Sequence, residues 1–176
     1  MNPVTEAIEN DSVAKMKSLI KSGADLNKPI LIGEEYELDD YDDISPLFYA
    51  IRKYASLDMI ELLLENGVDL MEIDSDGVSA LDMAIKFKRL DMIQFCIDKG
   101  FDINVTKRKS GITPVMLAAC FSNIEMMNLL LDNGGDVNVC DKAGMAPKDY
   151  AQKLGQKKMV DFLDEKGAKF NVYPNE

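Results

Sequence analysis

The sequence predicts an all-α repeat solenoid of about five helix-turn-helix units, joined by short turn or hairpin connections and closed by capping terminal repeats. A glycine-led motif, Gly67-Val68-Asp69, returns every 33 or 34 residues. Its copies begin at Gly67, Gly100, Gly134 and, in weaker form, Gly167, with an earlier copy at Gly23. A fixed period of this size is typical of stacked repeats, in which each unit buries its apolar face against its neighbours.

The first helix of each unit is predicted by a second motif, a small hydroxyl residue followed by proline or alanine and then an apolar residue. Its copies begin at Ser45, Ser79 and Thr113, and a degenerate copy begins at Ala146. Serine or threonine caps the free amides of a helix start, and proline suits the first helical position because its missing N–H costs nothing there. We therefore expect a helix directly after each copy.

The second helix of each unit is predicted by apolar residues at positions i, i+3, i+5, i+6 and i+7 of segments 57–64, 90–97 and 124–131. This stripe is broad enough to need neighbours on both sides. The glycine that follows each segment ends the helix. The methionines at one shared register, Met59, Met92, Met126 and Met159, are interpreted as packing residues, as is Cys96.

The terminal units differ from the others. The first lacks the opening motif, and its helices are expected at 3–10 and 13–22. The last is more polar on its second helix, as expected for a capping repeat with one solvent-exposed face. The expected repeats are 2–27, 43–71, 76–104, 110–138 and 143–168. Together they form one domain, 1–168, with an acidic insertion at 28–44 and a flexible tail at 169–176.

These motifs resemble ankyrin repeats, whose helix pairs open with Thr-Pro-Leu-like turns and close with Gly-x-Asp-x-Asn. The full closing form stands at 23–27, 100–104 and 134–138, and the resemblance covers residues 2–168. It implies a small stand-alone ankyrin protein, of a kind found in bacteria, that binds other proteins. Ankyrin repeats usually place a histidine after Thr-Pro-Leu, where this chain has Phe48, Asp82, Met116 and Asp149. Because that histidine helps to fix the turn by hydrogen bonding, we expect less rigid turns here.

Composition narrows the function. The chain has no histidine, which removes His-based acids, triads and zinc sites. Its net charge of −11 argues against nucleic acid as a partner, and no apolar run is long enough for a membrane span. The cysteines, Cys96, Cys120 and Cys140, lack metal-site spacing and fit reduced thiols. We expect a cytoplasmic, non-catalytic protein without cofactor or metal, monomeric when free.

The long connection between Asn27 and Ser45 is the first candidate binding element. Its candidate contact residues are Glu34, Glu35, Tyr36, Glu37, Asp39, Asp40, Tyr41, Asp42 and Asp43. So many acids repel one another, so the stretch should extend rather than pack. It is either an arm that docks on a basic protein, with the tyrosines as anchors, or a solvated loop. A calcium site is a third reading, although the EF-hand spacing is missing.

The second candidate element is the concave surface that the resemblance implies, formed by turn tips and the exposed side of each first helix. Its candidate contact residues are Arg52, Lys53, Asp76, Lys86, Phe87, Lys109, Cys120, Phe121 and Lys142. Phe87 and Phe121 share one register position and either meet a partner or tuck between repeats. The run Lys107-Arg108-Lys109 is a solvated turn or a contact to an acidic patch.

The leading hypothesis is a module that binds another protein with a basic surface through the acidic insertion and the concave face. Its sharper version is an inhibitor or immunity protein that neutralises a basic toxin or enzyme. The alternatives are a generic adaptor or regulatory protein and a calcium-binding protein that uses the acidic insertion. Enzyme function is disfavoured because no titratable group has a positioned partner base.

Overall fold

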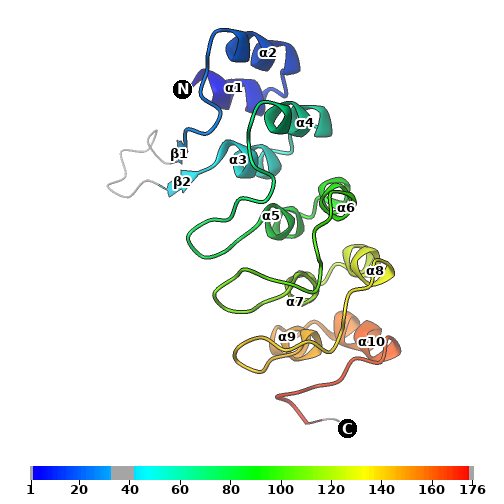
Figure 1. The fold of residues 1–176 in the computed structure, drawn as a ribbon. Coiled ribbons are helices and arrows are strands. Elements are labelled where there is room, and N and C mark those ends of the chain that lie inside the picture. Colours follow the sequence, from blue (N-terminus) through cyan, green and yellow to red (C-terminus); the bar gives the residue numbers. More distant parts are fainter. Residues whose placement is uncertain (1, 33–41, 175–176) are drawn as a thin grey trace. The chain divides into compact units, whose positions relative to one another are not determined.

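The computed structural model describes residues 2–32 and 42–174, and its main feature is a succession of helix pairs (Figure 1). The pairs are α1 Pro3–Glu9 with α2 Val13–Lys21, α3 Pro46–Arg52 with α4 Leu57–Glu65, α5 Ala80–Lys86 with α6 Leu90–Asp98, α7 Pro114–Cys120 with α8 Ile124–Asp132, and α9 Pro147–Lys153 with α10 Lys157–Glu165. Each pair lies inside one of the five expected repeats. The predicted architecture of about five helix pairs is confirmed.

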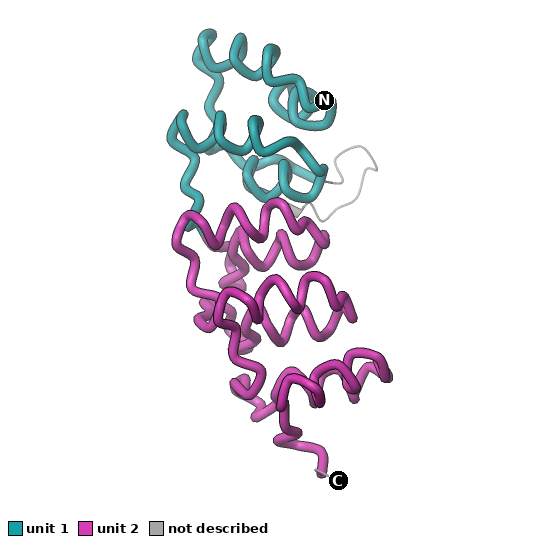
Figure 2. Tube along the Cα trace, turned by 90° about the vertical axis from the view of Figure 1, so that its right-hand side faces the viewer, with its two compact units in different colours: residues 1–72 teal, residues 73–176 magenta. Residues whose placement is uncertain are grey.

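The chain divides into two compact units, residues 1–72 and residues 73–176, which are coloured separately in Figure 2. In the N-terminal unit α1 packs on α2 and α3, and α4 packs on α2 and α3. In the C-terminal unit the first helices α5, α7 and α9 pack in sequence, and each also packs on the second helix of its own pair.

The helices begin where the hydroxyl motif predicts. The Ser45 hydroxyl accepts the N–H of Phe48 at 3.1 Å, and the Thr113 hydroxyl accepts the N–H of Met116 at 3.4 Å. The first repeat lacks this motif, and there Asn2 caps α1: its Oδ1 accepts the N–H of Val4 at 2.9 Å, and Pro3 is the first helical residue. Each cap satisfies an amide that the helix itself leaves free.

The core consists of the apolar stripes predicted from the periodicity. The four methionines of the shared register, Met59, Met92, Met126 and Met159, are fully buried, as is Cys96. Small residues on the first helices, Ala84, Ala118 and Ala151 among them, are also fully buried and permit close approach of neighbouring helices. Each large side chain removed from water in this way contributes about 1.5–3 kcal/mol.

The closing motif has a specific structural role in the C-terminal unit. Within it Asp102 Oδ1 accepts the N–H of Asn104 at 2.9 Å, which forms a tight turn. The Asn104 amide then donates to the carbonyl of Gly134 at 2.9 Å and accepts the N–H of Asp136 at 2.8 Å. Asn138 repeats this link by accepting the N–H of Lys169 at 2.9 Å. The motif therefore ties each closing turn to the next.

A two-stranded ribbon stands where the sequence predicts an extended insertion. Strand β1 Ile30–Ile32 pairs antiparallel with β2 Asp42–Ile44, with Ile30 opposite Ile44. Ile30 is buried, whereas Leu31 is 47% exposed, so the alternation of a half-buried strand is present at the base of the insertion. The ladder and the buried Ile30 hold the two ends of the insertion. The prediction that the acid-rich stretch 34–43 extends rather than packs falls mostly outside the described residues and stays a prediction.

The tail expected at 169–176 has fixed partners at its start. Asp149 is fully buried, and its carboxylate accepts the backbone N–H groups of Ala146, Asn171, Val172 and Tyr173 at 2.8–3.2 Å. These contacts extend the hydrogen-bonded array beyond the boundary expected at 168. The flexibility of the tail stays a prediction.

Candidate functional site

The loops that precede α5, α7 and α9 form the most regular surface feature of the C-terminal unit; we call residues 73–79, 106–112 and 140–146 the tip loops. Neighbouring tip loops bond through their backbones, because the N–H of Lys109 donates to the Asp76 carbonyl at 3.0 Å and that of Lys142 to the Ser110 carbonyl at 3.2 Å. A Cβ on Gly77 would lie 2.0 Å from the Lys107 carbonyl oxygen, so only glycine fits this approach. The three loops therefore stand in a defined row.

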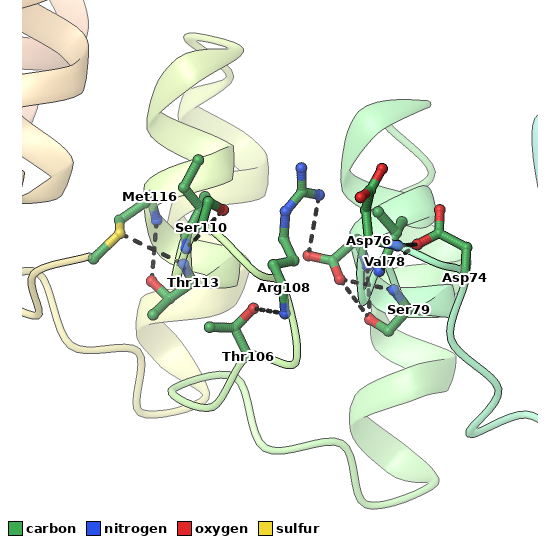
Figure 3. Close-up of polar contacts among 11 residues, drawn as sticks. Asp74, Asp76, Val78, Ser79, Thr106, Arg108, Ser110, Thr113 and Met116 are labelled. Atoms are coloured by element: carbon green, nitrogen blue, oxygen red, sulfur yellow. Dashed lines mark hydrogen bonds and ion pairs between the residues drawn. The ribbon is translucent and has the colours of Figure 1, made fainter. Parts of the chain in front are cut away.

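Side chains also stabilise each tip loop from within. Asp74 Oδ1 accepts the N–H groups of Asp76 and Val78 at 2.8 and 2.9 Å (Figure 3). Asp141 Oδ1 accepts the equivalent pair of N–H groups at 2.9 Å each. The middle loop uses hydroxyls, with Thr106 Oγ1 accepting the N–H of Arg108 at 3.0 Å. The two carboxylates are thereby used to shape the loops.

Carboxylates replace the histidine that is absent after the hydroxyl motif. Asp82 is 4% exposed, and its Oδ2 accepts both the N–H and the hydroxyl of Ser79, at 2.9 and 2.8 Å. Asp149 does the same work for the N–H of Ala146. Hydrogen bonds therefore fix both turns: Asp82 completes a capping box with Ser79, whereas Asp149 supplies only one half of such a box, because Ala146 has no side-chain acceptor. The expected loss of turn rigidity stays a prediction.

Arg108 reaches from the middle tip loop to Asp82, and Figure 3 shows it between the two repeats. The Arg108 Nη1 lies 3.8 Å from Asp82 Oδ1. Burial raises the pKa of Asp82, against the hydrogen bonds from Ser79 and the charge of Arg108, which lower it. The basic run Lys107-Arg108-Lys109 is therefore divided, since Arg108 turns inward while both lysines are exposed.

Cys120 and Tyr150 are close enough to Arg108 for its charge to act on both. Burial raises the pKa of the Cys120 thiol to about 11, although Arg108 and Lys153 act in the opposite direction. The Tyr150 hydroxyl donates to Asp141 Oδ2, and burial together with this bond raises its pKa. Neither group is ionised at neutral pH, so neither is prepared to act as a nucleophile or base.

The predicted contact residues fall into four groups. Exposed side chains belong to Asp43, Arg52, Asp76, Lys86, Lys109 and Lys142, and half-buried ones to Phe87, Cys120 and Phe121. Lys53 is held by Glu9, whose Oε1 lies 2.7 Å from the ammonium nitrogen. The Lys107, Lys153 and Leu154 side chains are exposed as well. Glu34, Glu35, Tyr36, Glu37, Asp39, Asp40 and Tyr41 lie outside the described residues, as does the Asp42 side chain.

Two contacts on this surface escaped the sequence reasoning. These are the pairs Arg108 with Asp82 and Tyr150 with Asp141, each of which joins a tip loop to a first helix. The pair Tyr150 with Asp141 had a usable signal in the sequence, because the two residues are nine positions apart and flank one helix start. The pair Arg108 with Asp82 had no such signal in the sequence, because it joins two repeats.

A groove of about 710 Å³ lies between α9, α10 and the tail. Its lining residues include Lys148, Gln152, Val160, Phe170 and Tyr173. The buried Lys148 ammonium pairs with Asp164 and lies 4.1 Å from the centre of the Phe170 ring. The charge inside the groove is thus matched by the chain's own side chains.

Comparison with known protein families shows to which family the chain belongs. The family of ankyrin repeats in three copies matches residues 7–107 and 99–173. The chain belongs to the ankyrin repeat family. Ankyrin repeats generally mediate binding between proteins and are typically non-catalytic. In this ankyrin array, the tip loops and the first helices correspond to the turn tips and first helices of ankyrin repeats.

Similar ankyrin proteins occur in large viruses. One ankyrin repeat protein of Fowlpox virus (strain NVSL) is 30% identical over 104 residues, which are 59% of this chain and 14% of that protein. A second from the same virus is 35% identical over 31% of this chain and 12% of its own length. One from Acanthamoeba polyphaga mimivirus is 30% identical over 58% of this chain and 27% of its own length. The expected bacterial affinity finds no support in these matches, and the chain spans less than a third of each relative.

Two further findings concern the described part of this ankyrin chain. No helix in it combines the length and the apolar character that crossing a bilayer requires. Within residues 2–32 and 42–174, no three acid or cysteine side chains are grouped to hold a metal ion. The calcium reading concerned the acidic insertion, most of which lies outside these ranges, and it stays a prediction.

Proposed function

We propose that this chain is a non-catalytic protein-binding module whose contact surface is formed by the tip loops and the ends of the first helices. The observation that carries this proposal is that each repeat contains two kinds of position, one that stabilises the fold and one that faces outward. Framework positions such as Asp74, Asp82 and Asp141 are used in internal hydrogen bonds, whereas the positions beside them carry exposed side chains of differing chemistry. A rigid framework that displays variable side chains suits recognition.

The ends of the first helices supply apolar contact area. Phe87, Phe121 and Leu154 share one register, directly after α5, α7 and α9. The two phenylalanines are half-buried, and Leu154 is 52% exposed. Partly supported apolar side chains of this kind lose little freedom on binding and can anchor a partner.

The acidic insertion is the second proposed contact, and it rests on charge. Residues 34–43 contain seven acids and no base, which favours a basic partner surface. A clean test keeps the ribbon, because removing Glu34 to Asp43 would also remove part of β2. The variant E34Q/E35Q/E37Q/D39N/D40N neutralises five of the seven acids and leaves Asp42–Ile44 intact. Partner affinity that falls in this variant supports the contact, and unchanged affinity contradicts it.

The inhibitor or immunity role expected from charge complementarity stays a prediction. The contacts of the described residues favour neither this role nor that of an adaptor. The cytoplasmic setting and the monomeric state likewise stay predictions.

Site-specific photo-cross-linking in native lysate tests the proposed function. A photoreactive phenylalanine replaces Leu154 on the proposed surface in one variant and Glu125, an exposed residue of α8, in the matched control. We expect one discrete protein adduct at position 154, competed by unlabelled wild-type chain, and little adduct at position 125. Equal adducts at both positions, or none at either, would contradict the proposal.

A further inference from the structure

The negative charge of the chain is unevenly distributed between its units. Residues 1–72 contain 6 Lys and Arg against 16 Asp and Glu, whereas residues 73–176 contain 14 against 15. The net charge of −11 therefore belongs almost entirely to the N-terminal unit. The C-terminal unit is close to neutral, and the arrangement of its charges decides what it attracts.

Within the C-terminal unit, exposed lysines gather on the tip loops and the ends of the first helices. We call this set the lysine face; its members are Lys86, Lys107, Lys109, Lys142 and Lys153. Lys109 faces Asp76 at 3.5 Å, with both side chains about three-quarters exposed. The other four form no ion pair with any residue in the described ranges.

The acids of the same elements offset these lysines only in part. Asp82 and Asp149 are buried as helix caps. Asp74 and Asp141 each direct an oxygen to two backbone N–H groups, and Asp141 also accepts the Tyr150 hydroxyl. Two carboxylates, Asp82 and Asp149, are thus removed from the surface. The five lysines then outnumber Asp74, Asp76 and Asp141, which leaves the outward charge of these elements positive.

The tip loops and the helix ends of the lysine face are neighbours in space. Arg108 of the middle tip loop and Lys153 at the end of α9 both act on the thiol of Cys120, at the end of α7. The Gln156 amide, in the turn after α9, donates to the Cys120 carbonyl at 2.6 Å. Arg108 of a tip loop and Lys153 at a helix end are therefore both near the half-buried Cys120, which directly precedes Phe121.

Building on the proposed function, we propose that the lysine face binds an acidic segment of a partner protein that also carries aromatic or aliphatic side chains. Carboxylates of such a segment would meet Lys107, Lys142 and Lys153, while its apolar side chains would cover Phe121 and Leu154. This partner surface is opposite in sign to the one that the acidic insertion would attract.

A protein segment fits this face better than a nucleic acid. The affinity of nucleic acid depends on many basic contacts, and the lysine face offers only five lysines in a unit with 14 bases against 15 acids. An acidic peptide has fewer charges, and its apolar side chains can use Phe121 and Leu154. The exposed cations here are lysines, whereas Arg108, the arginine of the tip loops, is turned toward Asp82.

Titration of the full-length 15N-labelled chain tests the assignment, with two-dimensional NMR as the readout. The probe is a synthetic peptide rich in glutamate with interspersed leucine and phenylalanine. One control peptide has lysine in place of each glutamate, and a single-stranded oligonucleotide of equal charge is the second control. We expect saturable shifts at amides of the tip loops and the ends of α5, α7 and α9 with the acidic peptide.

Two charge-matched variants locate the binding. K107E/K142E/K153E reverses three lysines of the lysine face, and K158E/K166E/K169E reverses three exposed lysines elsewhere in the same unit. We expect the first to weaken binding about tenfold or more, as for the loss of several exposed charge contacts, and the second by less than about twofold. Dispersed amide spectra confirm that each variant is folded.

Several outcomes would overturn the inference. These are absence of saturable shifts, shifts confined to α6, α8 and α10, equal weakening in both variants, or tighter binding of the oligonucleotide. The proposed function fails separately. Partner adducts at position 154 without acidic-peptide binding would reject only the lysine face as an acid-binding surface, whereas loss of both results would reject both proposals.

Discussion

Arg108 and Asp82 form an ion pair across 3.8 Å that joins the middle tip loop to the start of α5. Asp82 is almost fully buried, and its Oδ2 completes the cap with Ser79 while its Oδ1 faces the guanidinium. Arg108 Nε and Asp82 Oδ1 are both buried without a hydrogen-bond partner in the described structure. The attraction between them is therefore mainly coulombic, and it connects two adjacent repeats.

Replacing Arg108 should destabilise the chain through Asp82. Arg108→Ala leaves the buried carboxylate without its cation, and we expect the free energy of unfolding to fall by about 1–2 kcal/mol, since the arginine is itself partly exposed. In an Asp82→Asn background the same change should cost clearly less. Urea unfolding of the four proteins measures this coupling. Equal losses in both backgrounds would show that Arg108 acts through packing alone.

Asp149 should stabilise the fold at neutral pH and lose this effect in acid. Burial alone would raise its pKa, but the N–H groups of Tyr173, Ala146, Asn171 and Val172 together hold the pKa below its ordinary value. A depressed pKa stabilises the folded state above the unfolded-state value of about 3.9, and the contribution disappears as pH falls through the folded-state pKa. Asp149→Asn should therefore cost about 1–2 kcal/mol at neutral pH and much less in strong acid.

Urea midpoints of wild type and Asp149→Asn, compared at neutral and strongly acidic pH, check this prediction. Asp161→Asn is the matched control, because Asp161 is an exposed acid of α10. A difference between wild type and Asp149→Asn that stays constant on acidification would contradict the assigned role.

Asp82 should respond to pH in the opposite direction. Burial raises its folded-state pKa above the unfolded value, so its charged form opposes folding at neutral pH. As pH falls through the raised pKa, the folded state takes up a proton that the unfolded state does not, and stability increases relative to Asp82→Asn. The change is complete below the unfolded-state pKa of about 3.9. The same urea series measures it, and a wild-type advantage that shrinks in acid would refute the prediction.

Asn104 should be the most sensitive residue of the closing motif in the C-terminal unit. Asn104→Ala removes two hydrogen bonds, to the Gly134 carbonyl and from the Asp136 N–H, and should cost about 1–2 kcal/mol. Asn128→Ala on α8 is the control. Hydrogen exchange should also quicken at the Asp136 amide in Asn104→Ala. Unchanged exchange there would mean that the Asn104 link does not protect the turn.

The helix starts and closing turns were predictable because each motif forms hydrogen bonds with residues close to it in the sequence. Ser45 and Thr113 cap helices within three residues of themselves, and Asp102 closes a turn on Asn104, so the sequence alone carries the signal. The packing of the methionines follows from periodicity in the same way. The hydrogen bonds of Asp82 were not predicted, because the ankyrin pattern has a histidine at this position. A carboxylate can fix the turn as well, by accepting the N–H and the hydroxyl of Ser79.

The β-ribbon, the Arg108–Asp82 pair and the lysine face could not be predicted, because they depend on contacts between residues far apart in the sequence. The ribbon pairs Ile30 with Ile44 across a long acidic stretch, and three-residue strands carry too little pattern to predict. Arg108 meets Asp82 only because stacking brings their loops together. The lysine face likewise could not be predicted, because the sequence does not show that Asp82 and Asp149 are buried, and net charge alone had pointed to a basic partner.

Hydrogen exchange of the full chain, free and bound to the partner isolated by cross-linking, tests the central claim most directly. We predict slower exchange in the tip loops 73–79, 106–112 and 140–146 and at the ends of α5, α7 and α9, with α6, α8 and α10 unchanged. Protection confined to the second helices would contradict a binding surface built from tip loops and first helices.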